Sequence, residues 1–268
     1  LAHFFSGLST EVLLYLNAAA GVGMAVGLFF VFLEIGRKAR FMRVLLRPQS
    51  SWMTRETYAV AVFYPALLAD LIWPGPGLHL LVALAALVFL YCQARILYAA
   101  KGVPAWRCDL IPTMLVMTGL LEGVGLLGMA GGLAPWRFEA SMIFISASGA
   151  ILTLLNALIW QRYYAFAKRN GLPPLARAEL DRITPALRLL GHLAPLVLFT
   201  LATAFSESLL AFGGIAAVAG GVMWKFTVIT RASYLQGFAL PKMPQRGSGN
   251  RAAPPRTEGL DIKPLAAE

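Results

Sequence analysis

Residues 110–134 read LIPTMLVMTGLLEGVGLLGMAGGLA, and the only ionisable side chain among these 25 residues is that of Glu122. A helix needs roughly 20 mostly apolar residues to cross the hydrocarbon core of a bilayer. We therefore expect this segment to span a membrane as an α-helix. The number of similar segments in the rest of the chain then determines the fold.

Six other segments have comparable length and composition, so the sequence predicts an all-α integral membrane protein built as a bundle of seven transmembrane helices. The period-two alternation expected of an outer-membrane barrel is absent. Residues 1–230 are expected to form the bundle, and the polar residues 231–268, rich in Pro, Gly and Arg, a cytoplasmic tail. The seven expected helices cover residues 12–35, 57–73, 78–100, 110–134, 140–160, 189–205 and 209–230.

The overall composition agrees with this fold class. Hydrophobic residues make up 58% of the chain and charged residues 13%, and the mean hydropathy is +0.68. An ordinary soluble domain has about 25% charged residues, so a cytosolic globular enzyme is excluded. The net charge of +10 would suggest nucleic acid as the partner of a soluble protein. Here no nucleic acid is expected, because the charges alternate with the helices.

Lys and Arg residues alternate between the segments that follow the seven expected helices, which contain 6, 0, 2, 1, 6, 0 and 6 of them in chain order. The positive-inside rule places the richly basic segments in the cytoplasm. We expect a multi-pass protein of the bacterial cytoplasmic (inner) membrane with its C-terminus in the cytoplasm. The first residue is not Met, so a further segment is expected upstream.

Ionisable residues at membrane depth indicate functional sites because they are costly in lipid. Glu122 falls near the midplane, where it would relay a proton, line a ligand pocket or hydrogen-bond a neighbouring helix. Arg95 and Lys225 are expected to extend toward the interface. Together with Glu34 and His192 they fall at one depth on the cytoplasmic side, where they could exchange protons and bind the carbonyls of a quinone.

Three kinds of prosthetic group are disfavoured. Cys92 and Cys108 are isolated thiols, so no metal or iron–sulphur site is expected in this chain, although a disulfide between them stays open. A bis-histidine haem is not expected because His79 and His192 begin helices at opposite faces. A retinal protein is disfavoured because Lys225 lies near a helix end and residues 78–100 contain no carboxylate.

Glycines at a spacing of four predict close helix contacts. The pairs at residues 23 and 27, 119 and 123, and 128 and 132 have this spacing.

Two stretches carry a family resemblance: FLEIGRKARFMRVLLRPQSSWMTRE at residues 32–56 and TRASYLQGFALPKMPQRG at residues 230–247. Both resemble membrane-anchor subunits of molybdopterin oxidoreductases, in the NrfD/polysulphide-reductase and dimethyl-sulphoxide-reductase anchor family. They look most similar to anchors of phenylacetyl-CoA:acceptor oxidoreductase. Family members usually have eight helices, so the resemblance implies a first helix upstream of residue 1.

The resemblance implies a quinone site near the face where an iron–sulphur subunit docks. Glu34 stands where related anchors have a histidine at the quinol site, Arg40 matches a basic residue, and Glu56 matches the acid that ends the Ser-Trp motif. Trp52 is either an interfacial residue or an aromatic wall for the quinone ring. The residues expected to bind quinone or transfer its protons are Glu34, Arg40, Trp52, Glu56, Glu122 and His192.

The expected function is therefore that of a quinone-binding anchor that exchanges electrons between ubiquinone or menaquinone and an iron–sulphur subunit, which serves a molybdopterin catalytic subunit. No haem and no catalytic residue are expected in this chain. Each basic residue after the first helix either sets topology by meeting anionic lipid or contributes to docking. The alternative is a secondary transporter or channel. The expected docking residues are Arg37, Lys38, Arg43, Arg47 and Arg55.

Overall fold

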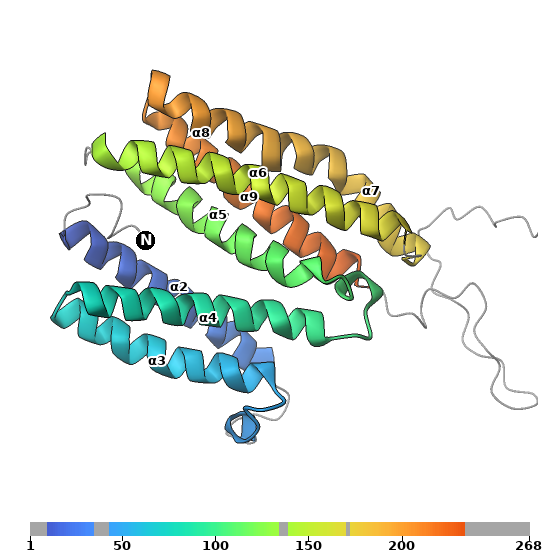
Figure 1. The fold of residues 1–268 in the computed structure, drawn as a ribbon, viewed down its shortest axis with the longest axis horizontal. Helices are drawn as coiled ribbons and strands as arrows, with labels where there is room; N and C mark the ends of the chain where they lie inside the picture. Colours follow the sequence, from blue (N-terminus) through green and yellow to red (C-terminus); the bar gives the residue numbers. More distant parts are fainter. Residues whose placement is uncertain (1–9, 35–42, 134–138, 170–171, 234–268) are drawn as a thin grey trace, which may run out of the picture.

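The computed structural model describes residues 10–34, 43–133, 139–169 and 172–233. This part of the chain is helical and contains no strand, as predicted (Figure 1). Seven helical rods run back and forth along one axis, each joined to the next at one end of the bundle. The elements are α2 (Thr10–Glu34), α3 (Trp52–Ile72), α4 (Pro76–Ala99), the 3₁₀ turn η2 (Pro104–Trp106), α5 (Leu110–Leu133), α6 (Glu139–Arg169), α7 (Pro174–Ala186), the π-helical η3 (Leu187–Leu193), α8 (Ala194–Phe205), α9 (Ser208–Phe226) and the π-helical η4 (Thr227–Arg231).

Six helices of the described residues are long and apolar enough to cross a membrane, so the chain is a multi-pass membrane protein. The seventh rod, α3, has 21 residues but includes Arg55, Glu56 and Asp70. It packs along the whole of α4, which is one of the six (Figure 1). The predicted bundle of seven helices is therefore confirmed, with α3 as its most polar member.

One predicted boundary is wrong. The sixth helix was expected over residues 189–205, after a long basic connection, but α7, η3 and α8 form one continuous span from Pro174 to Phe205. Likewise α6 continues to Arg169. A helix that leaves the hydrocarbon no longer needs apolar residues, so its hydropathy falls before the helix ends.

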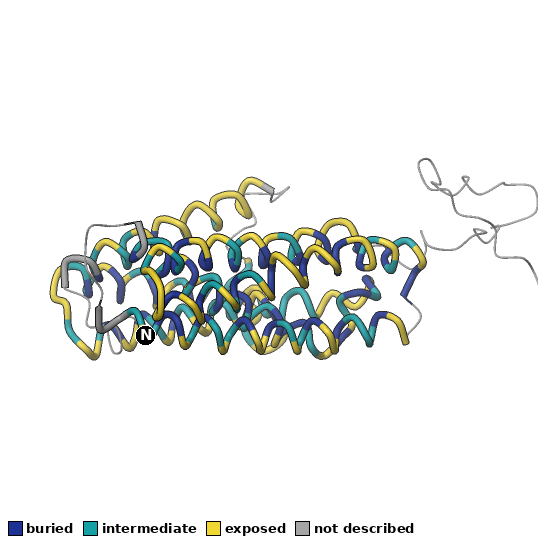
Figure 2. Tube along the Cα trace, turned by 90° about the horizontal axis from the view of Figure 1, so that it is seen from above, coloured by how far each residue is buried: buried dark blue, intermediate teal, exposed yellow. Residues whose placement is uncertain are grey.

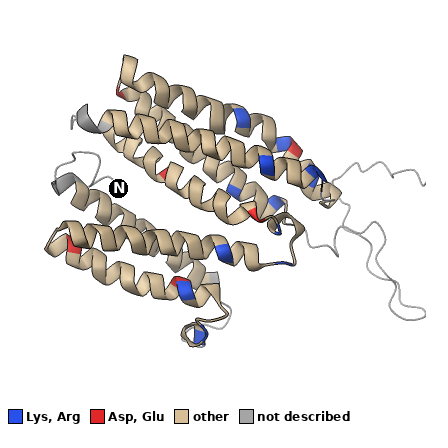
Figure 3. Ribbon diagram, viewed as in Figure 1, with Lys and Arg blue, Asp and Glu red and all other residues tan. Residues whose placement is uncertain are grey.

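Lys and Arg side chains of the described residues gather toward one end of the bundle, where α4, α6 and α9 end and α3, α5 and α7 begin (Figure 3). We call this the basic end. The other end, where α3 meets α4 and α8 meets α9, includes Asp70 and Glu207. This distribution is the one that the alternation of charges along the sequence predicts.

The closest packing lies between α5 and α9. A Cβ on Gly214 would lie 2.1 Å from the carbonyl oxygen of Gly125, and one on Gly128 would lie 2.8 Å from that of Leu210. Small residues let two backbones approach closely in this way. By contrast, α2 is the most exposed helix (Figure 2), and nothing lies within 4 Å of a Cβ built on Gly23 or Gly27, so the predicted contact through that pair is wrong.

Candidate functional site

The Ser-Trp-Met-Thr-Arg-Glu motif of residues 51–56 begins α3 and holds the preceding loop in place. Ser51 caps the helix by accepting a hydrogen bond from the Thr54 amide at 3.3 Å. The buried Thr54 hydroxyl donates to the carbonyl of Val44. Arg55 donates to the carbonyls of Pro48 and Gln49 at 2.8 and 2.7 Å. The motif thus positions residues 43–50 at the basic end while it starts the helix.

The Trp52 indole lies between two guanidinium groups. The guanidinium carbon of Arg55 is 4.2 Å from the ring centroid, and that of Arg95, on α4, is 4.8 Å from it. Tyr91 meets the same ring edge-on, with centroids 5.8 Å apart. Cation–π contacts of this kind fix an aromatic ring and bring positive charge to its faces.

Glu56 completes this cluster by accepting a hydrogen bond from the Gln93 amide at 3.0 Å. Trp52 begins α3 and lies 20 residues from its other end at Ile72, whereas Arg95 lies 19 residues from the start of α4 at Pro76. At 1.5 Å per residue both positions are about 30 Å from the opposite end of the bundle. The cluster therefore lies at the boundary between hydrocarbon and headgroups.

We call these six residues the Trp52 cluster; they are Trp52, Arg55, Glu56, Tyr91, Gln93 and Arg95. The structure thus brings together three residues that the sequence selected, Trp52, Arg55 and Glu56. Tyr91 and Gln93 were missed, although a glutamine two positions from an arginine in an otherwise apolar segment was an available signal. Arg95 joins the cluster rather than simply reaching for the interface.

Several predicted residues lie elsewhere or cannot be placed. Arg43 and Arg47 are exposed on the loop before α3. The side chain of Glu34 and the residues Arg37, Lys38 and Arg40 lie outside the described part of the chain.

Glu122 forms an ion pair with Lys225, whose Nζ lies 2.6 Å from Glu122 Oε2. Lys225 was expected to reach toward the interface, and the structure corrects this: the side chain crosses from α9 to α5. Pairing neutralises two charges that would each be costly in lipid. The structural alternative for Glu122, a hydrogen bond to a neighbouring helix, is therefore the arrangement observed.

A polar network continues from this pair. The Trp224 indole N–H donates to Thr118 Oγ1 at 3.0 Å, Thr118 donates to Asn156 Oδ1 at 2.7 Å, and Asn156 donates to the Met117 carbonyl at 3.1 Å. These bonds join α9, α5 and α6. Such networks hold helices together where no water satisfies polar groups.

His192 does not lie at the start of a helix, as the sequence suggested. It belongs to the π-helical segment η3 within the long span, and its ring is buried with neither nitrogen hydrogen-bonded. Its span lies on the opposite side of the bundle from α3 and the Trp52 cluster (Figure 1). The structure therefore does not bring His192 into one site with Trp52 and Glu56.

A cavity of about 600 Å³ lies between α2, α3, α4 and α5, toward the end opposite the basic end. Its wall is mostly apolar, and His79 is its ionisable residue. His79 Nδ1 lies 2.8 Å from the fully buried carboxylate of Asp70, which also accepts a hydrogen bond from Asn17 at 3.0 Å. The sequence placed Asp70 only toward the outer face, because the partner histidine belongs to a different helix.

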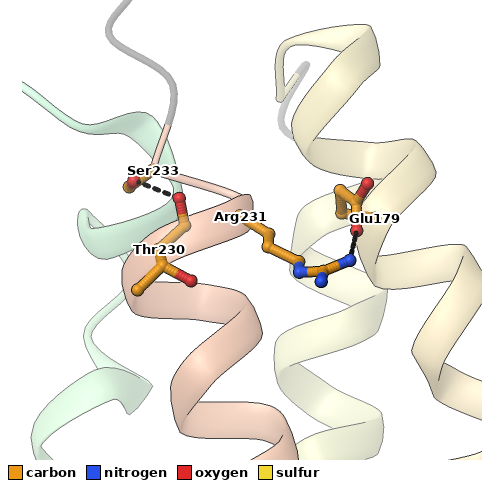
Figure 4. Close-up of a pocket in the computed structure, with 4 residues that line it drawn as sticks. All are labelled: Glu179, Thr230, Arg231 and Ser233. Atoms are coloured by element: carbon orange, nitrogen blue, oxygen red, sulfur yellow. Dashed lines mark hydrogen bonds and ion pairs between the residues drawn. The ribbon is translucent and has the colours of Figure 1, made fainter. Parts of the chain in front are cut away.

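A second, smaller pocket of about 380 Å³ lies at the basic end, between α7 and the end of α9 (Figure 4). Arg231 points across it toward Glu179, with 3.9 Å between their charged atoms. Ser233 donates to the carbonyl of Thr230 at 2.9 Å. The pocket is thus closed by the ion pair that fixes the end of α9 to α7.

The two cysteines are free thiols, both buried. Within the described ranges, no group of three or more His, Cys, Asp and Glu residues is arranged to hold a metal ion. Comparison with models of known protein families, with curated proteins and with solved structures finds no match.

Proposed function

We propose that this chain is the quinone-binding membrane anchor of a molybdopterin iron–sulphur oxidoreductase. It exchanges electrons between ubiquinone or menaquinone and an iron–sulphur subunit docked at the basic end. The observation that carries the proposal is the Trp52 cluster: an aromatic ring between two guanidinium groups with a carboxylate beside it, at the boundary of the hydrocarbon.

Each part of the cluster suits quinone chemistry. A quinone ring stacks on the Trp52 indole, and its long apolar tail stays in the lipid. Arg55 and Arg95 stabilise the negative charge that develops on the quinone oxygens during reduction. Reduction by two electrons takes up two protons, so the site needs titratable groups, and Glu56 supplies one at hydrogen-bonding distance from Gln93. Glu34 and Arg40, on the segment before the motif, are proposed to complete the site.

The same end of the bundle provides the docking surface. Arg43 and Arg47 are exposed on the loop that the motif holds in place. Together with Arg37, Lys38 and Arg55 they present positive charge to the acidic surface of a partner subunit. Electron transfer requires the quinone and the nearest cluster to be close, and this arrangement places both at one end. The positive-inside rule makes this end cytoplasmic in a bacterial inner membrane.

Substitution of Glu56 tests the proposal. Glu56→Gln should abolish quinone-linked turnover of the complex while its assembly and its turnover with an artificial dye stay intact. Glu34→Gln should do the same. Glu179→Gln, which removes a carboxylate at the same end on the other side of the bundle, is the matched control and should leave quinone kinetics unchanged. Unaltered quinone kinetics in both Glu56→Gln and Glu34→Gln would refute the assignment.

The second candidate function is a secondary transporter or channel, and the cavity lined by His79 favours it. A cavity of about 600 Å³ is large enough for a small solute. Purification distinguishes the two functions: an anchor brings iron–sulphur and molybdenum subunits with it from the native membrane, whereas a transporter purifies without them.

A further inference from the structure

A groove of about 240 Å³ lies between α6 and the span that continues through η3 into α8. Gln161 and Ala157 line it from α6, and Arg188, His192 and Leu196 line it from the facing span. It lies on the far side of the bundle from the Trp52 cluster (Figure 1). The proposed quinone site therefore makes no use of it.

His192 is the unusual residue in this groove. Its ring is more than nine-tenths buried, and neither Nδ1 nor Nε2 has a hydrogen-bond partner. An unsatisfied buried polar group costs about 1–3 kcal/mol. The residue also lies in a π-helical turn, a local distortion that is frequent at functional sites. A bound molecule with a polar atom opposite the imidazole removes this cost.

Arg188 defines the charge at the mouth of the groove. Its Nη2 donates to Gln161 Oε1 at 2.6 Å, and its guanidinium carbon lies 5.7 Å from the centroid of the Tyr164 ring. These two contacts hold an exposed cation beside the groove without neutralising it, because neither partner carries negative charge. An anion is the ligand group that this position favours.

The depth of these residues specifies the kind of anion. Gln161 lies 22 residues from the start of α6 at Glu139, and Arg188 lies 17 residues before the end of α8 at Phe205. These lengths, about 33 and 26 Å, bracket the thickness of the hydrocarbon core. The pair thus lies at the level of lipid headgroups, His192 lies one turn deeper, and Leu196 another turn deeper.

We propose that this groove binds one anionic phospholipid. Its phosphate contacts Arg188, an ester or hydroxyl oxygen hydrogen-bonds His192, and an acyl chain lies along Leu193 and Leu196. The order of charged, polar and apolar groups along the groove matches the order of the same groups in a phospholipid. The inference is independent of the proposed quinone site, because the two regions share no residue.

Native mass spectrometry of the full chain tests the proposal. The protein is freed of lipid in detergent, incubated with phosphatidylglycerol or with phosphatidylcholine, and examined for bound lipid. Wild type should retain one phosphatidylglycerol per chain in clear preference to phosphatidylcholine. Arg188→Gln should lower this preference about fivefold, as expected for one cation that meets an anionic lipid. His192→Phe should lower retention of both lipids, and His192→Gln should restore part of it.

The matched control is Arg162→Gln, which removes an exposed cation next to Gln161 at the same depth and should change nothing. Arg188 is exposed as well, so its substitution leaves the fold intact, which a thermal unfolding scan verifies. Equal retention of phosphatidylglycerol by Arg188→Gln and wild type overturns the proposal. So does an equal loss in Arg162→Gln, or displacement of the lipid by a short-chain naphthoquinone, which would make the groove a quinone site.

Discussion

Lys225 Nζ on α9 lies 2.6 Å from Glu122 Oε2 on α5, about 18 Å along α5 from its start at Leu110. The side chains are 29% and 17% exposed, so the pair is largely shielded without being fully buried. It lies next to the hydrogen bonds among Trp224, Thr118 and Asn156. Together these contacts make the α5–α9 interface the polar centre of the bundle.

Breaking one side of this pair should destabilise the protein. Lys225→Met leaves Glu122 without its cation, and we expect the free energy of unfolding in detergent to fall by about 2 kcal/mol, less than for a fully buried pair. Glu122→Gln should have a similar effect. The double variant should lose less than the sum of the two, because no charge then remains unpaired. Denaturation with SDS measures the three values, and simple additivity would show that the pair contributes no coupling.

Gly221 should be essential for the same contact. A Cβ at this position would lie 2.1 Å from Glu122 Oε1 and 2.8 Å from the carboxyl carbon. Gly221→Ala must therefore displace the carboxylate, and we expect a loss of about 1–3 kcal/mol in the same unfolding measurement. Gly23→Ala on α2, where nothing lies within 4 Å, is the control and should be neutral or slightly stabilising. An equal effect of both substitutions would contradict the packing described.

These two positions show what the sequence could and could not predict about packing. Glycines four residues apart identify a helix face on which a close approach is possible, but they do not name its partner. The pair at residues 23 and 27 has the expected spacing and faces open space, whereas Gly125 meets Gly214 of a helix 89 residues away in sequence. The number and order of the helices were predictable because lipid requires long apolar segments. The neighbours of each helix depend on tertiary packing.

The candidate site divides in the same way. Trp52, Arg55 and Glu56 belong to one local motif, so their proximity followed from the sequence. Arg95 lies opposite them because α4 returns antiparallel to α3, and equal helix lengths place both at one depth. His192 was misplaced because hydropathy marked a helix start at residue 189 where the chain is already helical.

Trp52 itself should be needed for quinone affinity. Trp52→Leu removes the ring that lies between Arg55 and Arg95 but preserves an apolar side chain. Loss of aromatic stacking of about 0.5–1.5 kcal/mol should raise the KM for quinone up to about tenfold, with little change in dye-linked turnover. Trp73→Leu, at the exposed end of α3, is the control. If both variants raise the KM equally, Trp52 is an interfacial residue and not a wall of the site.

Cys108, in the connection between α4 and α5, should resist alkylation in the folded protein. Its side chain is 3% exposed, and burial raises the pKa of its thiol. The thiolate, which is the reactive form, is therefore disfavoured at neutral pH. Because the unfolded chain releases this proton at lower pH than the folded chain, the contribution to stability is lost as the pH rises above the ordinary thiol range. In a Cys92→Ala background, maleimide labelling should be slow at pH 7.5 and become rapid in SDS; rapid labelling before unfolding would contradict the burial.

The orientation of the bundle is testable from both ends. Seven rods place the end of α9 and the start of α2 at opposite ends of the bundle (Figure 1). The basic end, which includes Arg231 at the close of η4, should face the cytoplasm. Alkaline phosphatase, which is active only in the periplasm, should therefore be inactive when fused after Glu268 and active when inserted at Ser206, between α8 and α9. The reverse pattern would place the basic end and the proposed docking surface outside, where an exported iron–sulphur partner would meet them.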